Sequence, residues 1–220
     1  MRRPAVLRAA IGVALLPTLL ILVYRFMSPP GTILMLVRLV QGETLVKHWQ
    51  PLERISPFLP QAVIASEDNR FCEHAGFDWK EMGGQFDRAM AGERTRGAST
   101  ITMQVAKNTL LWPGRDPLRK LLEAVLTPQI ELVWNKRRIM EIYLNVAETG
   151  PGIYGAEAAA QAYFGKPARV LSERESALIA AVLPNPRVWS PRRPTAYIVQ
   201  RARIIQRRIG QLGPLLDCVR

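Results

Sequence analysis

The sequence has few of the residues that build metal centres and disulfide frameworks. Its 220 residues include two cysteines, Cys72 and Cys218, and two histidines, His48 and His74. Without clustered cysteines or histidines, a zinc site is not expected. Two cysteines do not make a disulfide framework, and their separation in sequence says nothing about their distance in space, so we expect two free thiols. Pairing in an oxidising compartment is the alternative.

Several catalytic motifs are also missing. No Gly-x-Ser-x-Gly segment occurs, and no serine has a lysine three residues later. These absences exclude the α/β-hydrolase nucleophile elbow and the acyl-serine chemistry of penicillin-binding transpeptidases. The segment 150–155 matches G-x-G-x-x-G formally, but it carries proline at its second position and follows a helical pattern. We interpret it as a turn into an alanine-rich helix and not as a dinucleotide site.

Acidic residues are outnumbered, with 18 against 30 basic ones and a net charge of +12. Such a charge implies an acidic partner: nucleic acid, an anionic membrane surface or a phosphorylated substrate. The basic residues are dispersed and no nucleic-acid-binding motif occurs. We therefore expect no nucleic acid among the partners.

An apolar run at the N-terminus reaches, together with its flanks, the roughly 20 residues that are needed to cross a bilayer. It extends from Ala9 to Tyr24 behind three arginines, which predicts a membrane anchor within residues 1–27 and a cytoplasmic N-terminus. A cleaved signal peptide is the alternative. Residues 28–48 are a predicted linker, in which 32–40 is either a core helix or a segment lying on the membrane. Residues 49–220 are predicted to form one domain of mainly α-helical fold, because strand signals are few.

Adjacent carboxylates, Glu67 and Asp68, end a small apolar run, and Phe71 and His74 follow them. We interpret Glu67 as a catalytic base. The alternative is that the two acids merely end a helix at the surface.

Hydroxyl side chains follow Gly97 at the predicted start of another helix. Unpaired backbone N–H groups at such a helix start bind anions, and Lys107 and Arg115 lie just beyond. A plain Ser/Thr N-cap is the alternative. Residues 117–134 then predict an amphipathic helix with leucine and valine at i, i+3, i+4 and i+7. Glu123 lies on its other face, four residues after Arg119, so a simple ion pair within the helix is the alternative to a catalytic role.

Five motifs in register resemble the peptidoglycan glycosyltransferases, the family that polymerises lipid II. In chain order they are Glu67-Asp68-x-x-Phe71-x-x-His74-x-Gly76, Gly97-x-Ser99-Thr100-Ile101-Thr102-x-Gln104 with Lys107-Asn108, Arg119-Lys120-x-x-Glu123, Lys136-x-x-Ile139-x-Glu141-x-Tyr143-Leu144-Asn145, and Gly155 through Tyr163-Phe164-Gly165-Lys166. The resemblance covers about residues 49–212. Met103 is a departure, because many relatives carry glutamine there. The chain ends where larger relatives continue into a penicillin-binding domain, so the resemblance is to monofunctional members.

The resemblance implies a lysozyme-like helical glycosyltransferase domain behind one transmembrane helix. The implied partners are lipid II, a lipid-linked glycan chain, the membrane and other cell-wall synthesis or division proteins. The catalytic domain is expected on the periplasmic side of the inner membrane. A divalent cation, Mg²⁺ or Mn²⁺, near Glu67 or Glu123 is left open. The implied catalytic residues are Glu67 and Glu123, and the implied substrate-binding residues are Asp68, Phe71, His74, Ser99, Thr100, Gln104, Lys107, Asn108, Arg115, Arg119 and Lys120.

Two other functions fit some of these features. A lytic transglycosylase or lysozyme-like hydrolase would also be helical and could use one glutamate. It needs no binding site for a pyrophosphate, so the anion site predicted between Ser99 and Arg115 argues against it. A non-enzymatic basic protein anchored in the membrane would explain the charge alone.

Overall fold

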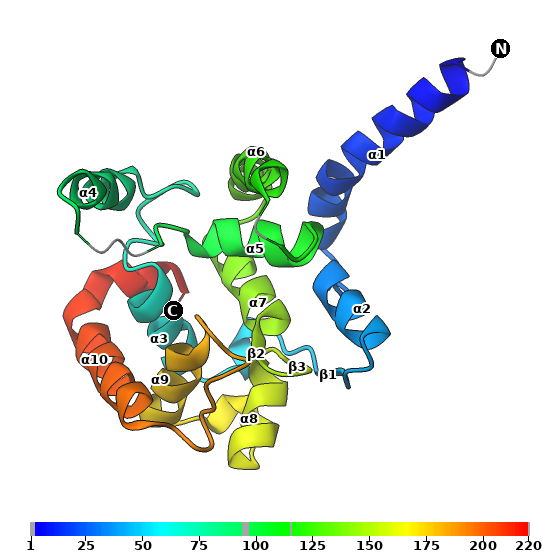
Figure 1. The fold of residues 1–220 in the computed structure, drawn as a ribbon. Coiled ribbons are helices and arrows are strands. Elements are labelled where there is room, and N and C mark those ends of the chain that lie inside the picture. Colours follow the sequence, from blue (N-terminus) through cyan, green and yellow to red (C-terminus); the bar gives the residue numbers. More distant parts are fainter. Residues whose placement is uncertain (1–2, 94–96, 115, 220) are drawn as a thin grey trace.

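The computed structural model describes residues 3–93, 97–114 and 116–219, and helices make up most of them (Figure 1). The mainly α-helical class predicted from the sequence is confirmed. The helices are α1 (Arg3–Tyr24), α2 (Ile33–Val40), α3 (Phe58–Glu67), α4 (Trp79–Met90), α5 (Ile101–Leu110), α6 (Pro117–Val133), α7 (Lys136–Val146), α8 (Ala156–Phe164), α9 (Glu173–Val182) and α10 (Ala196–Leu212).

Short elements complete the fold. Three 3-10 turns, η1 (Leu52–Arg54), η2 (Ala168–Val170) and η3 (Gly213–Val219), lie between or after the helices. A small sheet, which the sequence did not predict, pairs β1 (Val46–Lys47) in parallel and β2 (Glu148–Gly150) in antiparallel fashion with the central β3 (Ile153–Tyr154). With two or three residues each, these strands are too short for a periodicity signal.

The core surrounds α7, which runs through the middle of the domain in Figure 1. Ile139, Tyr143 and Val146 share one face of α7 and are almost completely buried, as their helical spacing predicts. Helices α3, α9 and α10 pack against one another on one side of it, while α5 packs between α6 and α7. This arrangement brings the end of α3 and the start of α5 to the same region of the surface.

Local sequence signals set several helix boundaries. Thr100 caps α5 by accepting from the N–H of Met103, and Ser172 and Glu175 form a capping box at α9. Gly155 precedes α8 with φ +83°, and a Cβ there would lie 2.8 Å from the carbonyl oxygen of Asn145. Glycine is therefore needed where β3 turns into α8 against α7.

Cys72 and Cys218 form a disulfide, with their Cα atoms 5.6 Å apart. The expectation of two free thiols is wrong. The two cysteines are 146 residues apart in sequence, but η3 returns to pack against α3 and α7, which brings Cys218 to the loop after α3. Sequence separation carries no information about that approach.

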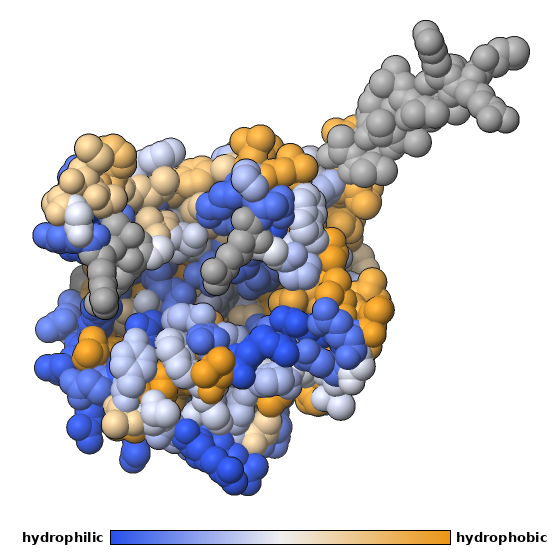
Figure 2. Space-filling view, in the orientation of Figure 1, coloured by the Kyte–Doolittle hydropathy of each residue, from blue (hydrophilic) through white to orange (hydrophobic). Residues whose placement is uncertain are grey.

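The apolar face of α6 points outward, contrary to what an amphipathic pattern usually means. Leu121 is 61% exposed, while Arg119 and Glu123 on the opposite face are 7% and 2% exposed. On α4, Trp79 and Phe86 are also exposed. Figure 2 shows hydrophobic surface along the edge formed by α4 and α6. The two helices therefore leave an unusually apolar rim on the domain.

Helix α1 projects from the domain and packs on α6 through its last turns (Figure 1). There Ile21 is buried and its carbonyl oxygen accepts from the indole N–H of Trp134 at 2.8 Å. Within the described residues, no helix has the length and apolar character that a membrane span needs. The anchor expected within residues 1–27 stays a prediction.

Helix α2 lies next along the chain and packs on α5. Met35 faces the core with 1% exposed, whereas Leu36 and Val40 on the other side are mostly exposed. Residues 32–40 thus include a core-facing helix and an apolar outer face, and their contact with a membrane stays a prediction.

Candidate active site

Glu67 is the last residue of α3, and its side chain is 13% exposed. One carboxylate oxygen, Oε1, accepts from the Ser66 hydroxyl at 3.0 Å and lies 3.7 Å from Nη2 of Arg201 on α10. The other, Oε2, accepts from Nε2 of Gln104 on α5 at 3.1 Å. Three helices therefore hold this carboxylate, which is the arrangement expected of a base that must keep one orientation.

Tyr143 of α7 sets the orientation of the Gln104 amide. Its hydroxyl donates to the Gln104 Oε1 at 3.2 Å, which turns the amide nitrogen toward Glu67. Burial raises the pKa of the Tyr143 hydroxyl well above its ordinary value, and the negative charges of Glu67 and Asp68 raise it further. Tyr143 therefore stays protonated and remains a donor at neutral pH.

Asp68 and His74 support the site from inside the domain. Nε2 of His74 lies 2.9 Å from Oδ1 of Asp68, and the backbone N–H of Ile101, the first residue of α5, donates to Oδ2 at 2.9 Å. Both side chains are almost fully buried. The carboxylate of Asp68 therefore stabilises the start of α5 and joins it to the C-terminal end of α3, next to Glu67.

Phe71 and Thr100 also have structural positions. Phe71 is 0% exposed, and the ammonium of Lys136 lies 4.5 Å from its ring centre. Thr100 is buried, donates to the carbonyl oxygen of Gly76 at 2.6 Å and caps α5. The predicted substrate contact of Phe71 does not fit this geometry, because its side chain is enclosed by protein. Thr100 is among the residues that line the cavity at Glu67, so its predicted substrate contact stays a prediction. The N-cap alternative is the observed role of Thr100.

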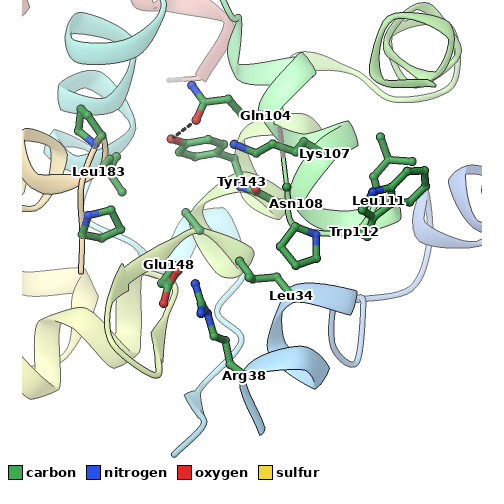
Figure 3. A pocket seen from close by; sticks show the side chains of 15 residues that line it. Leu34, Arg38, Gln104, Lys107, Asn108, Leu111, Trp112, Tyr143, Glu148 and Leu183 are labelled. Atoms are coloured by element: carbon green, nitrogen blue, oxygen red, sulfur yellow. Dashed lines mark hydrogen bonds between the residues drawn. The ribbon is translucent and has the colours of Figure 1, made fainter. Parts of the chain in front are cut away.

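Two cavities meet around Glu67 and Gln104. One, of about 350 Å³, is lined by Glu67, Ser66 and Ser99 among others. The other, of about 360 Å³, lies beyond Gln104 and is lined by Lys107, Asn108 and Arg38 among others (Figure 3). The hydrogen bond between Glu67 and Gln104 connects the two cavity walls. Glu67 faces the first cavity directly and adjoins the second through Gln104, so two sizeable ligand groups have room near the same carboxylate.

Lys107 brings positive charge to the second cavity. Burial lowers the pKa of its ammonium, which the nearby cations Arg119 and Lys120 lower further, while Glu123 and Glu67 oppose the shift. A partly desolvated cation in a cavity attracts an anionic ligand strongly, because little water screens it.

Glu123 of α6 is the centre of a buried ion cluster. Arg119 donates to Oε2 at 2.7 Å and Lys120 donates to Oε1 at 2.6 Å. The Lys120 ammonium also donates to the Ser99 hydroxyl at 3.3 Å, and this lysine is about half exposed. The intrahelical pair considered as an alternative is present, and it connects Glu123 to the cavity through Lys120.

A resident divalent cation does not fit these carboxylates. Both oxygens of Glu123 accept from cationic side chains, and both oxygens of Glu67 are near donors. No group of three potential metal-binding side chains occurs in the part of the chain that the structure describes. The cation left open near Glu67 or Glu123 has no suitable set of ligands here.

Most of the predicted polar residues converge on these cavities. Glu67, Ser99, Gln104, Lys107 and Asn108 line them. Arg119, Lys120 and Glu123 lie behind Ser99 and Lys107. Arg115, a predicted substrate-binding residue, lies outside the described residues.

Sequence reasoning missed Ser66 and Arg201. Arg201 belongs to none of the motifs, yet its Nη2 donates to Ser66 at 3.0 Å and its Nε donates to the Ala181 carbonyl oxygen at 3.2 Å. A signal was available, because Arg201 lies three residues after the buried Ile198 and four before the buried Ile205. An arginine on the buried stripe of a helix needs a partner inside the fold.

Known proteins are similar to this sequence over most of its length. A sequence model described as Transglycosylase matches residues 35–210. Over 211 residues the chain is 56% identical to a protein of Rhodospirillum centenum called biosynthetic peptidoglycan transglycosylase, covering 96% of this chain and 90% of the relative. Proteins of the same name from Caulobacter vibrioides and Pseudomonas fluorescens are 47% and 49% identical over 205 and 201 residues, covering 92% and 89% of this chain and 90% and 84% of those proteins. The matched region contains Glu67, Lys107 and Glu123.

Proposed function

This chain belongs to the transglycosylase family, and we propose that it is a peptidoglycan glycosyltransferase that joins lipid II units into β-1,4-linked glycan strands for the cell wall. The single observation that carries this function is the position of Glu67. Its carboxylate lines one cavity and is hydrogen-bonded to Gln104 on the wall of a second, where the partly desolvated cation of Lys107 lies.

In the proposed reaction, the acceptor is a lipid-linked disaccharide and the donor is a glycan on a polyprenyl pyrophosphate. Glu67 takes the proton of the acceptor's 4-hydroxyl as its oxygen bonds to the anomeric carbon of the donor. The bond from that carbon to the pyrophosphate oxygen breaks, and its electron pair leaves with the pyrophosphate. A positioned base contributes typically 10²–10⁴-fold to such a step. A single displacement inverts the anomeric configuration, so one base suffices.

The leaving pyrophosphate gains negative charge and needs preset cations. Lys107 supplies one on the wall of the second cavity, and Lys120 supplies another beside Ser99. Glu123 orients Lys120 and Arg119, and its carboxylate is the ion-pair partner of the buried Arg119 guanidinium. We assign Glu123 this positioning role, because both of its oxygens already face cations.

We also propose that the domain works at the outer face of the cytoplasmic membrane, held by the N-terminal helix. The apolar rim on α4 and α6 supports this proposal, because an exposed face with Trp79, Phe86 and Leu121 is costly in water and suited to lipid. The disulfide supports an oxidising compartment, since disulfides are rare in the cytosol. Both substrates carry lipid tails, so an enzyme at the same surface meets them in two dimensions.

Polymerisation of lipid II in detergent, read on a gel, tests the function. The wild-type chain should form glycan polymer, and Glu67→Gln should bind lipid II normally yet form none, because the amide is isosteric but cannot take the proton. Polymer formation by Glu67→Gln at near the wild-type rate would remove Glu67 from the mechanism. Release of soluble fragments from finished peptidoglycan by the wild-type chain would favour a lytic enzyme instead.

A further inference from the structure

Arg201 approaches the catalytic carboxylate from α10, with its Nη2 3.7 Å from the Glu67 Oε1. With Ser66 it lines a smaller cavity of about 160 Å³, and it is not among the described residues that line the two larger ones. Its side chain is 27% exposed. A guanidinium in this place can act on Glu67 without touching the substrate.

Two contacts fix the guanidinium before it acts. Its Nε donates to the carbonyl oxygen of Ala181, in the last turn of α9, where carbonyl groups lack partners within the helix. A cation near a helix C-terminus is also stabilised by the helix dipole. The contact leaves Nη2 free to face α3, where it lies 3.0 Å from the Ser66 Oγ and 3.7 Å from the Glu67 Oε1.

Ser66 has one hydroxyl proton and two acceptors within reach. Its Oγ lies 3.0 Å from the Glu67 Oε1 and 3.3 Å from the Ala180 carbonyl oxygen. Because Arg201 donates to the same oxygen, the hydroxyl accepts from the guanidinium and can direct its own proton to the nearer, charged acceptor. The result is a chain of hydrogen bonds from Arg201 through Ser66 to Glu67.

From these contacts, we propose that Arg201 and Ser66 form a positioning relay that holds the Glu67 carboxylate in its catalytic orientation. The relay acts on Oε1 while Gln104 holds Oε2, so both oxygens are fixed, and each keeps a further lone pair as an acceptor. Arg201 is a positioning residue, since it acts through Ser66 and through its charge. This proposal rests on the proposed function, because it assumes that Glu67 takes a proton from the acceptor.

Loss of the relay changes turnover more than binding. A catalytic group displaced by about 1 Å costs on the order of 100-fold in rate, whereas substrate contacts made by Lys107 and Ser99 are untouched. For Arg201→Ala and for Ser66→Ala we expect kcat to fall about 10- to 100-fold, with KM for lipid II within about twofold of wild type. In the double variant the losses should not multiply, because both residues serve one chain of contacts.

Arg201→Lys tests whether a positive charge near Glu67 is sufficient without the planar guanidinium and its several N–H donors. An ammonium can supply the charge near Glu67, but it cannot donate to the Ala181 carbonyl oxygen and to the Ser66 hydroxyl with the geometry of the guanidinium. We expect its kcat to lie between those of the wild type and Arg201→Ala. Arg203→Ala is the matched control, because Arg203 is exposed on the same helix, and its kinetics should equal those of the wild type.

The experiment measures kcat and KM for lipid II polymerisation, together with the melting temperature, for the wild type and these variants. If the wild-type chain makes no polymer, the proposed function fails and not the relay alone. If it does, a kcat for Arg201→Ala within about threefold of wild type overturns the relay, as do losses that multiply in the double variant. If Arg201→Ala does not fold, Ser66→Ala and Arg201→Lys decide by the same criterion: reduced kcat at unchanged KM supports the relay, and unchanged kcat overturns it.

Discussion

Replacing both cysteines by serine, as Cys72→Ser with Cys218→Ser, should destabilise the domain without removing its activity. Both positions are changed together so that no unpaired thiol remains. The disulfide joins the loop five residues after Glu67 to η3 near the end of the described chain. Leu216 and Val219 of η3 are buried in the core, so the segment keeps apolar contacts when the bond is absent.

The size of the loss follows from the closed loop. The two cysteines are 146 residues apart, and on the loop-closure model a cross-link of that length restricts the unfolded chain by about 5 kcal/mol at 25 °C. Removal of native disulfides usually costs about 2–5 kcal/mol, so we expect a loss in that range. For a domain of this size each kcal/mol shifts the melting temperature by about 2–4 °C.

Thermal unfolding followed by circular dichroism, with and without reductant, measures the effect. Reductant should lower the melting temperature of the wild type to about that of the double serine variant, and it should not change the variant. At 25 °C the variant should still polymerise lipid II, because η3 remains docked. The reasoning would be refuted if the double serine variant lost less than about 1 kcal/mol of unfolding free energy, or if reductant did not change the melting temperature of the wild type.

Three further predictions concern single residues. The pKa of Lys107 is lowered below the ordinary 10.5, so its ammonium loses its proton at a lower pH than an exposed lysine, and affinity for the pyrophosphate donor should fall as the pH rises through that lowered pKa. The free energy of unfolding changes in the opposite direction. Between the folded and unfolded pKa values the unfolded chain binds more protons, so the lysine's contribution to stability rises with pH. Lys107→Arg should keep donor affinity at alkaline pH, and a wild-type affinity that is constant up to the range of ordinary lysines would contradict the assignment. Glu123→Ala leaves Arg119 buried without its partner and should lower the free energy of unfolding by about 3–5 kcal/mol in urea titration, whereas an effect near zero would mean that Arg119 reaches water. Gly155→Ala should cost about 1–3 kcal/mol for its backbone conformation and more for the approach to Asn145, and a variant as stable as wild type in the same titration would show that the turn can rearrange.

Local patterns were sufficient to find the helices and much of the site. The capping box at Ser172 and Glu175, the αL glycine at Gly165 and the buried stripe of α7 are each decided by residues within a few positions of one another. The same holds for Glu67 at the end of α3 and Lys107 on α5. The family motifs added their order along the chain, and the comparisons confirm the family.

Helical periodicity could not say which face of α6 is buried. Leu118, Leu121 and Val125 belong to the apolar stripe of α6, and the structure turns them outward. It buries the pair of Arg119 and Glu123 instead. Periodicity measures how apolar residues are grouped around a helix, but it does not reveal whether protein, lipid or water lies against each face.

What the sequence by itself determined is the mainly helical class, the caps, the family and the identity of Glu67 as the candidate base. Only the tertiary structure decided that Cys218 meets Cys72, that Phe71 is enclosed, and that Arg201 reaches Ser66 and Glu67. The physical reason is the distance along the chain between the residues that interact. Hydrogen bonds along one helix connect residues four apart, whereas a contact between α3 and α10 depends on how every element between them packs.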